Sequence, residues 1–173
     1  MKYYGFSPSF LQSHGPLSWQ HMSWALGHGL IGWKDLVQYA NTGPKPSGAL
    51  TEAAESLRNL DKESAHRANE LADILAGTEA AITDDEKRHR WMLLTLDWVL
   101  ANQELFKDPL GEVEEIYADF GYPQEIAPLV RYMPPTDGWQ PEEHSAEVNL
   151  ARLFRLWADF VERKRCEYGW QTQ

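Results

Sequence analysis

Two Glu-x-x-His pairs have the spacing of metal ligands: Glu63 with His66, and Glu86 with His89. In helical bundles that hold two iron or manganese ions, such pairs project inward from two helices, beside single glutamates from two others. Both pairs here lie in charged stretches that precede the apolar parts of their segments, whereas bundle ligands lie at mid-helix. We therefore expect no metal ligands and no cofactor. A metal-dependent helical-bundle enzyme that uses these pairs is the alternative.

Other catalytic patterns are absent from the sequence. Cys166 is the single cysteine, so an intrachain disulfide is impossible, and no base is evident beside it. There is no Gly-x-Ser-x-Gly turn, no P-loop and no dinucleotide-type glycine pattern. We expect no catalytic residues and predict that the protein is not an enzyme.

The chain is strongly acidic, with 16 Lys and Arg against 26 Asp and Glu and a formal net charge of -10. Such a surface repels nucleic acid and anionic membranes, and it attracts basic macromolecules. The start of the chain lacks a signal peptide's apolar core, and the most apolar run, residues 91–101, is too short to span a bilayer. We expect a cytoplasmic protein that binds neither nucleic acid nor membranes directly.

Acidic side chains cluster in residues 112–119 and in residues 137–147. Adjacent glutamates on an amphipathic helix are typical of a solvated face, but they would also suit a partner rich in Lys and Arg. Trp139, between Gly138 and Gln140 in a proline-bounded loop, is either an aromatic anchor for a partner or a side chain packed back onto the helices. The residues that we expect to contact a partner are Asp84, Asp85, Glu112, Glu114, Glu115, Asp137, Trp139, Glu142 and Glu143.

Helix signals recur along the chain, and no alternating run of β-branched residues predicts a strand. Thr83 and Glu86 form a capping box for a helix to about Gln103, and Asp108–Pro109 begins the next helix. Other helices are expected from Ser18, across residues 33–40, across 51–76 as one helix or two, after Pro123, and from about Ser145 to Tyr168. The last helix is expected to bury Val148, Ala151, Phe154, Trp157, Ala158 and Val161.

These elements predict an all-α, single-domain bundle of about six to eight helices over residues 1–173. Residues 1–16 are expected to form an extended N-terminal arm. Residues 133–144 are expected to form a loop before the last helix, and residues 41–48 are a loop by their Pro and Gly content.

Three segments resemble a known family: LSWQHMSWALGHGLIGWKDLVQYA (17–40), HRWMLLTLDWVLANQELFKDPLGEVEEIYADFGYPQEI (89–126) and VRYMPP (130–135). The chain is similar to a bacterial domain-of-unknown-function family of small helical proteins. Members are encoded beside polymorphic toxins and assigned as immunity proteins, including those of contact-dependent growth inhibition systems. Residues 117–123 and 131–134 carry most of the specificity. They look structural, and the resemblance suggests an ion pair between Asp119 and Arg131.

The resemblance implies an immunity protein that neutralises a cognate toxin by blocking its active site or substrate groove. Its partner would be a toxin C-terminal domain, which we expect to be basic and a nuclease, since an acidic inhibitor can fill a basic substrate groove. The resemblance implies no catalytic residue in this sequence. An adaptor protein unrelated to toxins is a further alternative, and the neighbouring gene would distinguish it.

Overall fold

The computed structural model describes residues 1–43 and 50–170. All of the regular structure in these residues is helical, which confirms the all-α class and the expected number of helices. Most of the predicted loop at residues 41–48 lies outside the described residues, while its first two residues continue a helix. The α-helices are α1 Pro8–Ser13, α2 Trp19–Gly27, α3 Trp33–Thr42, α4 Thr51–Arg58, α5 Ala68–Ala76, α6 Asp84–Ala101, α7 Pro109–Asp119 and α8 Ala146–Tyr168.

Short 3₁₀ helices join several of these elements. They are η2 Ala65–Arg67, η3 Gln103–Leu105, η4 Ala127–Leu129 and η5 Pro141–Glu143. The stretch 51–76 is therefore two helices, separated by a turn at residues 59–64. The short helix expected after Pro123 is the 3₁₀ helix η4. Among the described helices, none is long and apolar enough to cross a membrane.

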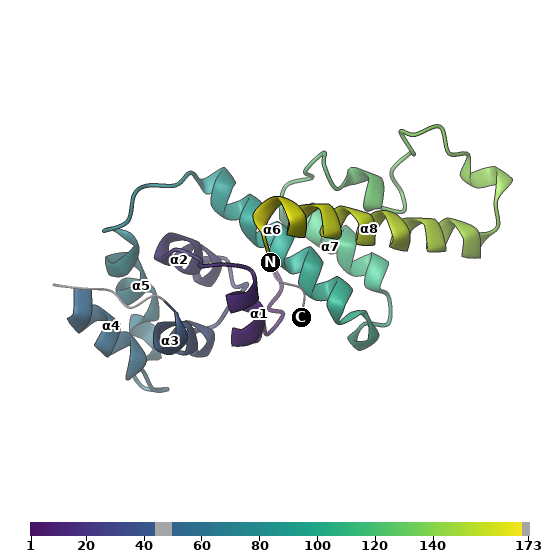
Figure 1. Ribbon diagram of the computed structural model, residues 1–173. Coiled ribbons are helices and arrows are strands. Elements are labelled where there is room, and N and C mark those ends of the chain that lie inside the picture. Colours follow the sequence, from purple (N-terminus) through teal and green to yellow (C-terminus); the bar gives the residue numbers. More distant parts are fainter. Residues whose placement is uncertain (44–49, 171–173) are drawn as a thin grey trace. The chain divides into compact units, whose positions relative to one another are not determined.

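The chain forms two compact units (Figure 1). The N-terminal unit contains residues 1–91 with Gly169 and Trp170, and the C-terminal unit contains residues 92–168. Helix α6 supplies residues to both. The expectation of a single domain stays a prediction.

In the N-terminal unit, α2 packs against α5, α5 against α4, and α4 against α3. The side chains that meet there are almost fully buried: Met22, Leu36, Leu57, Leu71 and Leu75. Burial of large apolar side chains supplies most of the favourable free energy of such a unit.

The predicted extended arm at residues 1–16 is wrong, because it contains helix α1. The Ser7 hydroxyl accepts a hydrogen bond from the Phe10 backbone N–H at 3.2 Å, and Pro8 occupies the first helical position. Phe10 and Leu11 are then buried.

The C-terminal unit contains most of α6, and α7, η4 and α8. Helix α6 buries nearly all of its middle turns, as expected of a central helix, and η4 packs against both α7 and α8. The largest fully buried side chain of this unit is Trp157 of α8.

The face of α8 predicted to be buried is only partly right. Trp157 and Val161 are buried, but Val148 is 45% exposed, and Ala151 and Ala158 are exposed. The buried face also includes Arg152 and Phe160. A charged residue can lie on a buried face when its charge is neutralised by a nearby carboxylate.

Candidate functional site

The loop before α8 is fixed to that helix by two side chains one turn apart, Asn149 and Arg152. The amide oxygen of Asn149 accepts a hydrogen bond from Trp139 Nε1 at 2.8 Å, and its nitrogen donates to the Pro141 carbonyl at 2.9 Å. The Arg152 guanidinium donates to the Asp137 carboxylate at 2.5 Å. Residues three apart lie on one face of a helix, so Asn149 and Arg152 hold residues 137–141 of the loop on the same side of α8.

The Trp139 ring is packed back onto the molecule. Its face stacks on His144 with the ring centroids 3.9 Å apart, and the Arg152 guanidinium lies 5.1 Å from the ring centroid. The side chain is half-buried, and its N–H is used within the chain. Of the two interpretations of Trp139, the structure therefore supports the packed one: the indole is a wall of the site and not a free anchor.

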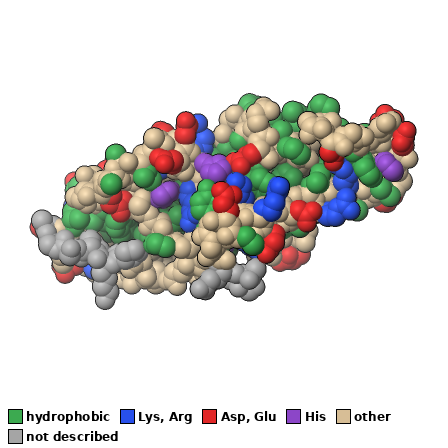
Figure 2. Space-filling model, turned by 45° about the horizontal axis from the view of Figure 1, so that its top comes forward, with side chains coloured by type: hydrophobic (Ala, Val, Ile, Leu, Met, Phe, Trp, Pro, Cys, Tyr) green, Lys and Arg blue, Asp and Glu red, His purple; other side chains and the backbone are tan. Residues whose placement is uncertain are grey.

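Between this loop, η4 and the first turns of α8 lies a groove of about 340 Å³. Figure 2 shows hydrophobic side chains at the surface over this part of the molecule, with acidic side chains gathered at its end. The lining is mostly apolar: Pro128, Val130, Met133, Pro135, Trp139, Pro141, Ala146, Leu150 and Leu153, with the polar Arg131, Asn149 and Arg152. A concave, mainly apolar surface with a few placed polar groups is the usual form of a binding site.

The groove lining includes Arg131, which is held by two carboxylates. Its guanidinium donates to both oxygens of Asp108, at 3.1 and 2.8 Å, and to both oxygens of Glu114, at 2.7 and 3.0 Å. These charge-assisted bonds raise the pKa of Arg131, and the bond from Arg131 holds the pKa of Asp108 below its ordinary value. The expected pair of Asp119 with Arg131 is wrong, because Arg131 is bound by Asp108, which caps α7, and by Glu114 in the middle of that helix, and not by the residue at its end.

Asp108 also caps α7, as the sequence predicts. Its carboxylate accepts a hydrogen bond from the Gly111 backbone N–H at 3.0 Å. A Cβ atom at Gly111 would lie 2.6 Å from one Asp108 oxygen, so the absence of a side chain lets the carboxylate serve both the cap and Arg131.

The structure brings four of the predicted contact residues together at the groove. Trp139 lines its wall, Asp137 is bonded to the lining residue Arg152, and Glu142 and Glu143 directly follow the lining residue Pro141 on η5. Both glutamates are exposed, and neither carboxylate bonds to another described residue. They are the predicted acids that remain most available to a partner.

The three predicted glutamates of α7 are not equivalent. Glu114 is adjacent to the groove, but its carboxylate forms an ion pair with Arg131. Glu112 is half-buried and Glu115 is exposed, and neither lines the groove.

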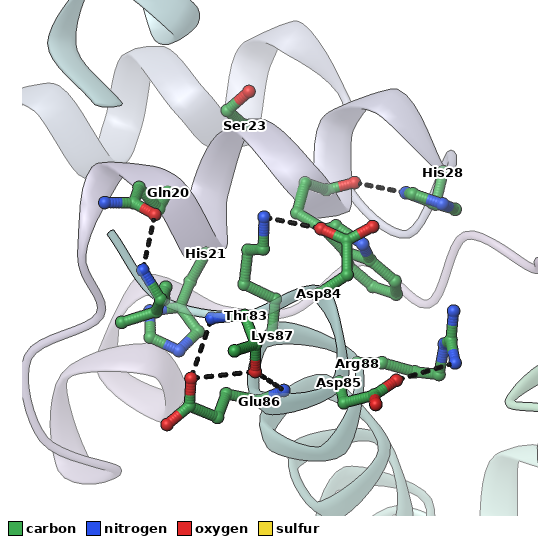
Figure 3. Close-up of polar contacts among 12 residues, drawn as sticks. Gln20, His21, Ser23, His28, Thr83, Asp84, Asp85, Glu86, Lys87 and Arg88 are labelled. Atoms are coloured by element: carbon green, nitrogen blue, oxygen red, sulfur yellow. Dashed lines mark hydrogen bonds and ion pairs between the residues drawn. The ribbon is translucent and has the colours of Figure 1, made fainter. Parts of the chain in front are cut away.

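Asp84 and Asp85 belong to the N-terminal unit, at the start of α6 (Figure 3). Asp84 lies 2.6 Å from the Lys87 ammonium, which holds the pKa of this carboxyl below its ordinary value, and Asp85 lies 3.2 Å from Arg88. At a helix N-terminus, the negative charges of these two side chains interact favourably with the positive end of the helix dipole. The geometry indicates a structural role at the helix start for both residues.

In the two Glu-x-x-His pairs, the side chains of Glu86 and His66 are used in local hydrogen bonds. Glu86 completes the predicted capping box, accepting hydrogen bonds from the Thr83 backbone N–H at 2.7 Å and its hydroxyl at 2.8 Å (Figure 3). His66 Nδ1 lies 3.0 Å from the carbonyl oxygen of Glu63, in an exposed turn. In the part of the chain that the structure describes, no three His, Cys, Asp or Glu side chains are grouped as metal ligands.

Three residues of the site, Asn149, Leu150 and Arg152, were not expected from the sequence. Asn149 and Arg152 are polar residues with helical spacing, three positions apart, in a segment that is otherwise apolar on that side. That pattern, with Asp137 in the preceding loop, was an available signal for a loop fixed to a helix.

The fold and site define an all-α protein with a preformed apolar groove and an acidic margin. Residues 8–165 match the family model described as an uncharacterized protein conserved in bacteria, DUF2247. The chain belongs to this bacterial family. No curated protein and no solved structure matches it.

Proposed function

We propose that this protein neutralises a bacterial toxin domain by binding it, and that it transforms no substrate itself. The observation that carries the proposal is the pair of exposed acids, Glu142 and Glu143, at the margin of a preformed apolar groove. An apolar centre with a charged margin is the usual composition of a protein–protein interface.

Two sequence properties support the same function. The segments 17–40, 89–126 and 130–135 resemble immunity proteins encoded beside polymorphic toxins. The formal charge of -10 favours encounter with a basic partner, such as a nuclease with a basic substrate groove. In this proposal the protein acts in the cytoplasm of the toxin-producing cell and its siblings, where it covers the toxin's active site or substrate groove.

The proposal is tested with the product of the gene directly upstream, which we expect to contain the toxin domain. Co-expression should restore the growth of cells that produce the toxin domain, and the two proteins should purify as a complex. Growth arrest despite equal expression, or the absence of a complex, would contradict the proposal.

Charge reversal tests the electrostatic part. Glu142→Lys with Glu143→Lys should lower the association rate about tenfold at low salt, and the loss should shrink as salt is raised. The matched control is Glu104→Lys with Asp159→Lys, two exposed acids outside the groove lining, which changes the net charge equally. Equal effects of the two double variants would place the contact elsewhere. Glu114 is unsuitable for this test, because its reversal would also disrupt the Arg131 network.

A further inference from the structure

The groove has an open apolar wall on α8. Leu150 lines it and remains 41% exposed, and Trp139 and Met133 are half-buried in it. Its volume of about 340 Å³ lies in the range of sites that hold a ligand, so one or two large side chains of a partner would fit.

Negative charge flanks this apolar surface. On the η5 side, Glu142 and Glu143 follow the lining residue Pro141, and the exposed Glu147 follows the lining residue Ala146. On the η4 side, the lining residue Arg131 is bonded to two carboxylates behind it, Asp108 and Glu114, which leaves this group with one net negative charge.

The positive charge within the groove wall is already neutralised. Arg152 is 9% exposed and forms its ion pair with Asp137 at 2.5 Å. An anionic partner would therefore meet no free cation among the lining residues and would be repelled at the margins.

We infer that the groove receives a segment of the toxin in which a large apolar side chain is flanked on both sides by Lys or Arg. The inference rests on the proposed function and specifies the chemistry of the partner. The apolar side chain fills the space beside Leu150 and Trp139, and its basic neighbours meet the acids on the η5 and η4 sides.

A second copy of this chain fits the groove less well. The chain carries a net charge of -10, and a symmetric dimer through this face would bring the same acidic margins close together. Like charges that face each other across an interface oppose association.

The test uses the full-length protein and three short synthetic peptides with the same Leu–Phe–Leu centre. Their flanks are Lys and Arg, Ser and Gln, or Asp and Glu. Binding is followed through the indole N–H resonance of Trp139 in proton–nitrogen NMR spectra, assigned with Trp139→Phe. The basic-flanked peptide should shift this resonance and bind at least about tenfold more tightly than the acidic-flanked one.

Leu150→Ser should weaken the basic-flanked peptide about tenfold, because it removes the apolar wall without adding charge. Val148→Ser is the matched control, since Val148 is on the same helix, is similarly exposed and does not line the groove. Glu142→Gln with Glu143→Gln should lower the preference for basic flanks while keeping the apolar contact.

Equal binding of the three peptides, or an equal effect of Leu150→Ser and Val148→Ser, would overturn the inference. So would a concentration-dependent shift of the Trp139 resonance without peptide, which would assign the groove to a second copy. Selective peptide binding without any complex with the neighbouring toxin would leave the groove chemistry standing and refute the proposed function. A toxin complex that is insensitive to Leu150→Ser would support the proposed function and refute the inference about the groove.

Discussion

Asp97 of α6 and Arg165 of α8 form a two-point ion pair inside the C-terminal unit. Arg165 Nε donates to one Asp97 oxygen at 3.0 Å and Nη2 donates to the other at 2.5 Å. Asp97 has no exposed surface, so its charge must be compensated within the protein, and this guanidinium contributes to that compensation. The bonds to Asp97 raise the pKa of Arg165. The pair joins two helices that are far apart in the sequence.

We predict that Arg165→Met lowers the free energy of unfolding by about 3 kcal/mol, because it removes the guanidinium charge that faces a buried carboxylate. Asp97→Asn with Arg165→Met should recover part of this loss, since both charges are then removed. Urea denaturation measures both effects. Asp159→Asn, at an exposed position of α8, is the control and should change the stability by less than about 0.5 kcal/mol. An additive double variant would show that the two side chains are not coupled.

Acid should weaken the Arg131 network. Because the pKa of Asp108 is depressed in the folded state, its stabilising contribution is present above its ordinary value of 3.8 and is lost as the pH falls through the lower folded value. Arg131→Gln should lower stability by about 1 kcal/mol at pH 7, and by less near pH 3. Urea midpoints across this pH range check the prediction. Parallel pH curves for the two proteins would contradict it.

His21 should make the N-terminal unit less stable in mild acid. Burial, followed by the positive charges of Arg90 and Lys87, lowers the pKa of His21 to about 4. Its Nδ1 lies 3.2 Å from the Ser18 backbone nitrogen and accepts that N–H, a role that the protonated ring cannot keep (Figure 3 shows His21 beside α6).

Since the unfolded chain takes up this proton more readily, stability should fall from about pH 6.5 to pH 4. About 1–2 kcal/mol is expected to be lost, because the ring is partly exposed and its charge partly screened. His21→Gln should flatten this part of the stability curve, and an NMR titration of the ring should give a pKa near 4. A pKa near 6.5 would contradict the burial argument.

Arg152 should control the mobility of the loop before α8. Arg152→Gln removes the ion pair with Asp137 and the cation–π contact with Trp139, and should raise amide hydrogen exchange in residues 137–144 by about tenfold. Arg155→Gln is the control, at an exposed position one turn away. Unchanged exchange in the first variant would show that Asn149 alone fixes the loop.

The elements with local signals were predictable from the sequence. The capping box of Thr83 and Glu86 and the Asp108–Pro109 start place α6 and α7 correctly, because each signal acts within one helical turn. Ser7 and Pro8 carry a comparable signal for α1, which an expectation based on the Gly, Pro and Ser content of the segment overlooked.

The site was less predictable, because its contacts join distant residues. Arg131 is bonded to Asp108, 23 positions away, and Trp139 to Asn149, ten positions away. The sequence marked the acids of this loop and its single Trp, Trp139, as candidates. It could not show that Asp137 is committed to Arg152, or that the groove lies beside the acids that remain exposed.

The side chain of Asn149 has a consequence for the speed of recognition. Because its amide oxygen holds Trp139 and its amide nitrogen holds Pro141, the groove already has its shape before a partner binds. Little conformational entropy of the loop is then lost on binding. Diffusional encounter, and not a conformational change, should therefore limit the association rate. The observed rate constant for association should increase linearly with the concentration of the partner, without a plateau.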